Sequence, residues 1–469
     1  MRQLLLGVSA SGARCEGGFN GPGEPANHWS AWERTGKVPR GAGGDLWASP
    51  ERALDRAAAA GAAACLLSLE WARVEPAPGR LDDAALDRYA HIFSLCTERE
   101  MQPIVVLHDL THPEWLGEEF WLTPGSPDRF CDHVTRVVSR LGTTCTHWVT
   151  SRQPNAVALG GWVGGRHPPR RVGALSDAWA VVDNLLAAHV LAYEAIHDVQ
   201  SQWGPEVTIG LRASSSYDWQ RMFVDLLCGP ALGVAHGALD GWVRERRARH
   251  DAVTPPRGLL DLAARRLASF GAPFGATLSV ARRPSPRRIE HEVFAYAQRR
   301  GPADVDAGRG VRPLDALLTV WRPPAAASLA APDALTSGAR ALVARALGTR
   351  ALGTTRVARV APWEVRPDPE ALGAWCREQA ALTPGLALWI EDGFATCRST
   401  ARADGWDRAA YLRAQTAAVA QARASGAPVV GYLSGSLCEG ADPTWPDADF
   451  GLDVDRLPAA AERSPVTDR

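Results

Sequence analysis

The sequence lacks several features that would mark out a class of protein. It contains one lysine, Lys37, and its nine cysteines are scattered, with no C-x-x-C pair to suggest a zinc site or a disulfide framework. No apolar run approaches the roughly 18 residues that a membrane-spanning helix needs. The formal net charge of -1 gives no global attraction to nucleic acid or to an anionic membrane. We therefore expect a cytoplasmic protein without metal or other cofactor that binds neither nucleic acid nor membrane, and the sequence does not indicate its oligomeric state.

What is present is a regular alternation of short apolar runs and longer amphipathic stretches rich in Ala, Arg and Leu, which is typical of a parallel β-sheet covered by helices. Helices are expected at Pro50–Ala60 and Ala409–Ser425. The apolar runs number eight: Leu4–Val8, Ala64–Leu69, Pro103–Leu107, His147–Thr150, Thr208–Leu211, Ala316–Val320, Ala387–Ile390 and Val429–Leu433.

Eight such units close naturally into a (β/α)₈ barrel. The short apolar run at the N-terminus is read as the first strand and not as a signal peptide, because it is too short for one. We predict a single-domain barrel over residues 1–456 and a flexible C-terminal tail over residues 457–469. The pattern fades between residues 212 and 313, where helices and long loops are expected.

Polar and aromatic side chains gather directly after the predicted strands. In a (β/α)₈ barrel these positions converge at the C-terminal ends of the strands, where such enzymes keep their active sites. The residues in question are Arg14, Glu16, Asp109, His112, Arg152, Gln153, Trp321, Arg322, Glu391, Asp392, Glu439 and Asp442. The sequence therefore predicts one site at this face for a small polar ligand.

Several motifs in order resemble glycoside hydrolase family 1. CLLSLEWARVEP, from Cys65 to Pro76, is similar to the family segment Y-R-F-S-I-x-W-S-R-I-x-P, and LHDLTHPEWL resembles L-x-H-W-x-x-P-x-W-L. WVTSRQP stands where the family has W-x-T-x-N-E-P, and LWIEDG where it has I-T-E-N-G. GYLSGSL and DFGLDVD extend the resemblance nearly to the C-terminus, so it implies a β-glucosidase-like (β/α)₈ barrel.

The chemistry of that family needs two carboxylic residues, one that attacks the anomeric carbon and one that protonates the leaving oxygen. The resemblance implies that Glu391 is the nucleophile. The second position holds Gln153, whose amide can donate a hydrogen bond but cannot transfer a proton. We therefore expect a retaining glycosidase or transglycosidase for an unusual, activated or anionic β-glycoside. The alternative is a repurposed or catalytically inactive barrel with a binding role or a non-hydrolytic reaction.

The resemblance also places charged residues where the family has neutral sugar-binding groups. Arg14, Asp109 and Arg152 take the places of a glutamine, a histidine and an asparagine, and Leu66 takes the place of an arginine beside the nucleophile. The guanidinium groups suit an anionic substrate, but an ion pair of Arg14 with Asp109 that fills the old sugar site is equally expected. Glu391 could likewise form a salt bridge with Arg14 or Arg152 in an inactive pocket. The candidate ligand contacts are Arg14, Asp109, Arg152, Trp321, Asp442 and Trp445.

Two further groups of residues are given structural interpretations. Glu70 to Glu75 is expected to be the solvated end of a strand. His108 and His112 lie near a strand end, but no second ligand pair has a spacing that suits a metal.

Overall fold

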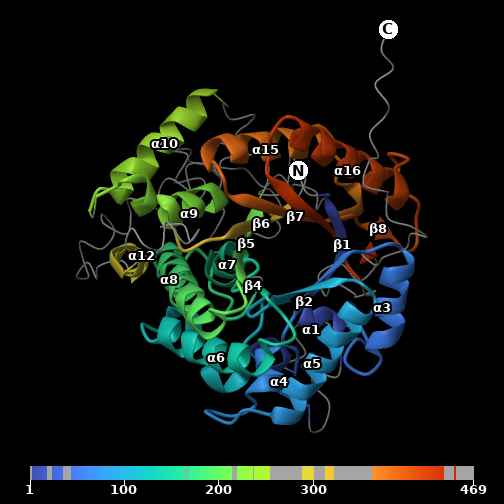
Figure 1. Cartoon of the computed structure of the whole chain (residues 1–469), viewed down its shortest axis with the longest axis horizontal. Coiled ribbons are helices and arrows are strands. Elements are labelled where there is room, and N and C mark those ends of the chain that lie inside the picture. The colour runs from blue at the N-terminus through green and yellow to red at the C-terminus, as the bar shows by residue number, and fades with distance from the viewer. Residues whose placement is uncertain are drawn as a thin grey trace.

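The computed structural model describes residues 3–17, 24–34, 44–163, 165, 167–213, 219–235, 237–253, 288–299, 312–321, 362–437 and 448–449. Eight parallel strands close into a barrel in the order β1-β2-β3-β4-β5-β6-β7-β9, with helices around the outside (Figure 1). The strands are β1 (Leu5–Ala10), β2 (Ala64–Ser68), β3 (Gln102–Val106), β4 (His147–Val149), β5 (Glu206–Ala213), β6 (Ala316–Trp321), β7 (Ala387–Gly393) and β9 (Val429–Gly435). Each predicted apolar run overlaps one of these strands, so the predicted (β/α)₈ fold is confirmed. The predicted tail, residues 457–469, lies outside the described residues.

Three of the larger helices begin at an aspartate that caps the first turn. Asp82, Asp368 and Asp407 each accept a hydrogen bond from the backbone three residues on, at the starts of α5, α15 and α16. The helices expected at Pro50–Ala60 and Ala409–Ser425 are α3 and α16, each within one residue of its expected bounds. The larger helices are α3 (Pro50–Ala59), α5 (Asp83–Glu98), α6 (Ser126–Leu141), α8 (Leu175–Val199), α9 (Trp219–Cys228), α10 (Leu239–Val253), α12 (Arg288–Arg299), α15 (Pro369–Leu382) and α16 (Arg408–Ala424).

Contrary to the expectation that no apolar stretch has this length, helix α8 contains one, Ser176–Val199, that is long and apolar enough to cross a membrane by length and composition alone. In the fold, 67% of its most apolar window is buried. The helix packs against α6 on one side and α12 on another. Its apolar composition is therefore matched by its burial as a helix of the barrel wall.

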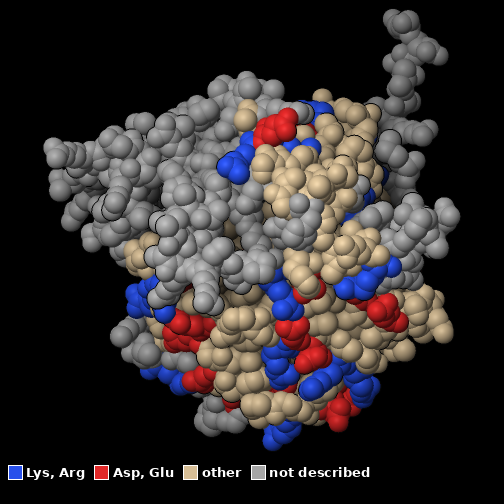
Figure 2. Space-filling view, turned by 90° about the vertical axis from the view of Figure 1, so that its left-hand side faces the viewer, with Lys and Arg blue, Asp and Glu red and all other residues tan. Residues whose placement is uncertain are grey.

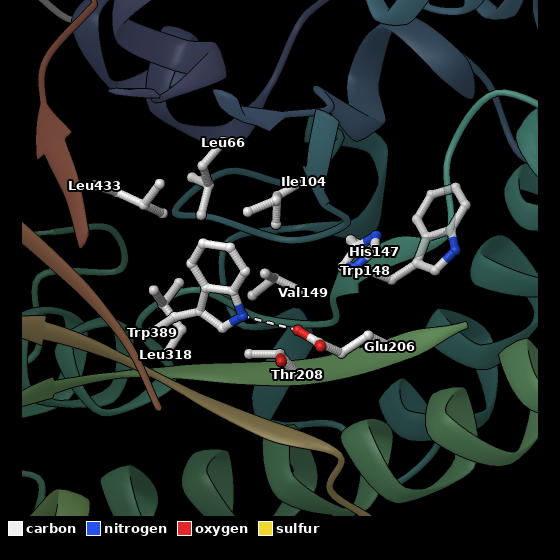
Figure 3. Close-up of a pocket in the computed structure, with 10 residues that line it drawn as sticks. All are labelled: Leu66, Ile104, His147, Trp148, Val149, Glu206, Thr208, Leu318, Trp389 and Leu433. Atoms are coloured by element: carbon white, nitrogen blue, oxygen red, sulfur yellow. Dashed lines mark hydrogen bonds between the residues drawn. The ribbon is translucent and has the colours of Figure 1, made fainter. Parts of the chain in front are cut away.

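The inside of the barrel holds its own apolar core, separate from the layer between strands and helices. Leu66, Leu318 and Trp389 belong to this inner core and are at most 4% exposed. The indole of Trp389 lies against Gly431, where a Cβ atom would stand 2.0 Å from Trp389 Cζ3. The indole nitrogen donates to Glu206 Oε1 at 2.8 Å (Figure 3). The side chain of Trp389 therefore lies inside the barrel, in contact with β9 and hydrogen-bonded to β5.

The described part of the surface mixes charges of both signs. Figure 2 shows blue and red side chains interspersed on one face and not gathered into separate patches. Exposed ion pairs such as Arg99 with Asp55 at 2.7 Å fit this distribution. The coloured part of this face therefore carries no large field of one sign that would attract a polyanion.

Candidate active site

The C-terminal ends of the strands bring together three of the predicted site residues, Arg152, Glu391 and Asp109. Arg152 follows β4, and its Nε donates to Glu391 Oε2 at 2.9 Å while its Nη2 donates to Glu391 Oε1. Its Nη1 donates to Asp109 Oδ2 at 3.0 Å. The three residues are 8%, 2% and 5% exposed. One buried guanidinium thus bridges the predicted nucleophile on β7 and the carboxylate that follows β3.

Two serines donate to the same oxygen of Asp109 that Arg152 contacts. Ser11 Oγ donates to Asp109 Oδ2 at 2.6 Å, and Ser68 Oγ at 3.3 Å. Burial alone would raise the pKa of Asp109, but Arg152, Ser11 and the charge of Arg14 outweigh it and lower that pKa. Burial alone would lower the pKa of Arg152, but the two carboxylates raise it further above its usual value. Both shifts favour the charged forms of Asp109 and Arg152, which pair with each other inside the protein.

The remaining predicted contacts occupy different surroundings. Arg14 is an exposed residue in the last turn of α1 (Gly12–Cys15). Gln153 is 8% exposed and directly precedes α7 (Pro154–Ala158), whose first turn its side chain does not cap. Trp321, at the end of β6, is fully buried, with its ring centroid 6.0 Å from that of Trp375. Asp442 and Trp445 lie outside the described residues. The ligand contacts expected of the residues in this paragraph stay predictions.

The expectation that Glu70 to Glu75 forms a solvated strand end is wrong. Glu70 is 1% and Glu75 0% exposed. The chain turns directly after β2 into the short helix α4 (Trp71–Val74), which folds both carboxylates inward. Glu75 accepts from the indole nitrogen of Trp71 at 3.0 Å and pairs with Arg129. Residues four apart lie on the same face of a helix, so the spacing of Trp71 and Glu75 was a signal in the sequence for this hydrogen bond.

Glu70 is a buried carboxyl group whose partners are mostly neutral. Thr111 Oγ1 donates to Glu70 Oε2 at 2.6 Å, and the backbone nitrogen of Ala72 donates to Oε1 at 3.3 Å. The nearby guanidinium of Arg73 is engaged with Glu16 at 2.8 Å. Burial raises the pKa of Glu70 to about 7, against the opposing effect of Thr111.

This raised pKa gives a testable pH dependence. The folded protein holds the Glu70 proton more tightly than the unfolded chain, so stability falls as the pH rises from about 4.5 to about 7 and then levels off. We expect Glu70→Gln, which cannot ionise, to remove this loss, so that relative to wild type it gains roughly 3 kcal/mol between pH 4.5 and pH 8. Urea denaturation across this range measures the difference. The same substitution at the exposed Glu51 is the control, and a Glu70→Gln effect that is constant with pH would contradict the assignment.

The two histidines near the end of β3 are packing residues. His108 is 1% exposed and accepts from the indole nitrogen of Trp121 at 3.1 Å, and burial lowers its pKa to about 3. His112 is stacked on His28 with ring centroids 3.6 Å apart, and burial lowers its pKa to about 4. Both rings are therefore neutral at physiological pH. Within the described ranges, no group of three His, Cys, Asp or Glu side chains is placed to hold a metal ion.

The chain belongs to the class of closed (β/α)₈ barrels, and its buried carboxylates lie at the C-terminal ends of the strands. Within that class the chain is related to one family, because residues 2–222 match the model of glycosyl hydrolase family 1. The predicted resemblance to this family is confirmed.

Two relatives by sequence and one solved structure support the relationship to this family. The chain is 29% identical over 202 residues to 6-phospho-beta-galactosidase 1 of Streptococcus pneumoniae, covering 42% of this chain and 43% of that protein. It is 24% identical to a cyanidin 3-O-glucoside 7-O-glucosyltransferase (acyl-glucose) of Delphinium grandiflorum, covering 36% and 35%. The chain thus spans less than half the length of either relative. The family 1 β-glucosidase of Thermotoga maritima has the same fold, with a TM-score of 0.65 at 18% identity over 96% of this chain and 92% of that one.

Proposed function

We propose that this chain is a retaining glycosidase or transglycosidase that uses Glu391 as its nucleophile on activated β-glycosides. The observation that carries the proposal is the position of Glu391 near the end of β7, where the Nε and Nη2 of Arg152 donate to its two carboxylate oxygens in a buried site. A carboxylate that is positioned before the sugar arrives has less orientational freedom to lose during the attack. The relationship to family 1 supports this reading of the residue.

The reaction takes two steps. A carboxylate oxygen of Glu391 bonds to the anomeric carbon while the bond to the leaving group breaks, and the leaving group takes the electron pair. Water or an acceptor hydroxyl then attacks the same carbon, the ester to Glu391 breaks, and the attacking oxygen releases its proton to solvent. Gln153 donates no proton, so the leaving group must be stable as an anion. The relative whose name specifies acyl-glucose supports a donor of this activated kind.

The charge balance favours an activated substrate over an anionic one. Three donor groups of Arg152 are taken up by the two carboxylates of Glu391 and Asp109. The charge of this guanidinium is therefore already balanced by two carboxylates, which disfavours binding of a phosphate or carboxylate of a ligand. An incoming anion would also meet two buried negative charges.

The same contact also favours a second candidate function. Because Arg152 donates to both oxygens of Glu391, this contact lowers the reactivity of the carboxylate as a nucleophile unless it loosens. A barrel in which that contact never opens would be catalytically inactive and would bind a polar small molecule at the same face. Covalent trapping separates the two functions.

We would incubate the protein with 2-deoxy-2-fluoro β-glycosides that carry an activated leaving group, and measure the intact mass. The expected result is one added fluoroglycosyl group, mapped to the peptide that contains Glu391. Glu391→Gln should form no adduct, whereas Glu370→Gln, at an exposed position of α15, should react like wild type. If folded wild-type protein forms no adduct across a series of sugars, the glycosidase proposal fails and the binding function is favoured.

A further inference from the structure

A small cavity lies inside the barrel, with Trp389 among its lining residues (Figure 3). Most of its wall is apolar, with Leu66, Ile104 and Leu433 among the lining residues. It leaves about 10 Å³ for the centre of a water molecule. This is the space that one buried water needs, and it is too small for any larger solute.

One side of the cavity is polar, because β5 begins there. Glu206 and Thr208 are two residues apart on this strand, so their side chains face the same side of the sheet. His147, at the start of β4, is paired in register with Glu206. All three residues line the cavity. A dry cavity requires apolar walls throughout, and this one does not have them.

The hydroxyl group of Thr208 carries the argument. Thr208 is 4% exposed, and its Oγ1 has no hydrogen-bond partner within the part of the chain that the structure describes. A buried hydroxyl without a partner is destabilising, and buried water commonly satisfies such groups. Glu206 supplies a second partner, since only one of its carboxylate oxygens accepts the hydrogen bond from Trp389 Nε1 at 2.8 Å.

We infer that this cavity is a binding site for one water molecule, which hydrogen-bonds to Thr208 Oγ1 and to the Glu206 carboxylate. The water completes a chain of contacts that runs from β5 through Glu206 to the indole of Trp389. Trp389 stands two residues before Glu391 on the same face of β7. The water therefore belongs to the inner layer that supports the active-site end of this strand. The inference is independent of the proposed function, because it concerns the interior of the fold.

A crystal structure at high resolution tests the inference directly. The expected result is a single density peak within hydrogen-bonding distance of Thr208 Oγ1 and Glu206 in wild type and in Thr208→Ser, which keeps the hydroxyl. In Thr208→Val, which has the same shape without the hydroxyl, the peak should be lost. An empty cavity in wild-type density would overturn the inference.

The direction of the change in Tm gives a second, independent readout. If the water is bound, Thr208→Val removes one of its partners and lowers the Tm below that of wild type. If the hydroxyl is unpaired in a dry cavity, the same substitution relieves an unsatisfied polar group and raises the Tm. A Tm equal to or above that of wild type would therefore count against the water site.

Discussion

Replacing Gln153 by Glu is expected to raise the rate of hydrolysis of aryl β-glycosides with poor leaving groups by about 10² to 10⁴-fold. The substitution installs a carboxylic acid in a buried position directly after Arg152. A positioned acid accelerates only those reactions in which the leaving oxygen needs a proton. The measurement is kcat/KM for a series of aryl glycosides whose phenol pKa values differ, and the dependence of rate on phenol pKa should become flatter in the variant.

Two controls define this experiment. Gln153→Met removes the amide without adding an acid and should bring no gain with poor leaving groups. Combining Gln153→Glu with Glu391→Gln should abolish turnover, because the acid cannot replace the nucleophile. An equal acceleration for good and poor leaving groups would show that the new carboxylate does not act as a general acid.

Removing the guanidinium of Arg152 is expected to destabilise the fold by about 3 to 5 kcal/mol. Arg152→Met leaves the carboxylates of Glu391 and Asp109 buried, and Glu391 then loses both of the hydrogen bonds that it receives from Arg152. An uncompensated buried charge is costlier than the loss of the ion pair itself. Urea denaturation at pH 7 gives the change in the free energy of unfolding.

The variant Arg152→Met combined with Glu391→Gln provides the matched control, since it removes one of the stranded charges and should recover part of the lost stability. Arg152→Lys keeps the charge but cannot form the two-pronged contact with Glu391, so its loss should be smaller than that of Arg152→Met. A loss below about 1 kcal/mol for Arg152→Met would mean that the network behaves like an exposed ion pair.

The barrel could be predicted because each of its strands is a short apolar run that a single sequence displays. The site was partly predictable for a related reason: residues that follow parallel strands must meet at one face, and Asp109, Arg152 and Glu391 do. Which charged side chains of the site pair with one another could not be predicted in full. Whether Arg152 turns toward a ligand or toward Glu391 depends on the three-dimensional packing around it, including the serines that fix Asp109.

The failure at Glu70 and Glu75 has a different cause. Two acids close together after a strand are usually solvated, and here a four-residue helix turns them into the protein. Glu75 is compensated by Arg129, which lies 54 residues later in the chain. Sequence spacing does not reveal a partner at that distance, because the contact exists only once α4 and α6 have packed.

The contact between Trp389 and Gly431 constrains how this barrel can change during evolution. Any side chain at position 431 would collide with the indole, so residue 389 must become smaller before residue 431 can become larger. That first step would open a void inside the barrel, and truncating a buried tryptophan costs about 3 to 5 kcal/mol. Single substitutions therefore cannot place a larger residue at position 431 of β9 without passing through a strongly destabilised intermediate. Sequence drift is confined to other positions unless β7 and β9 change together.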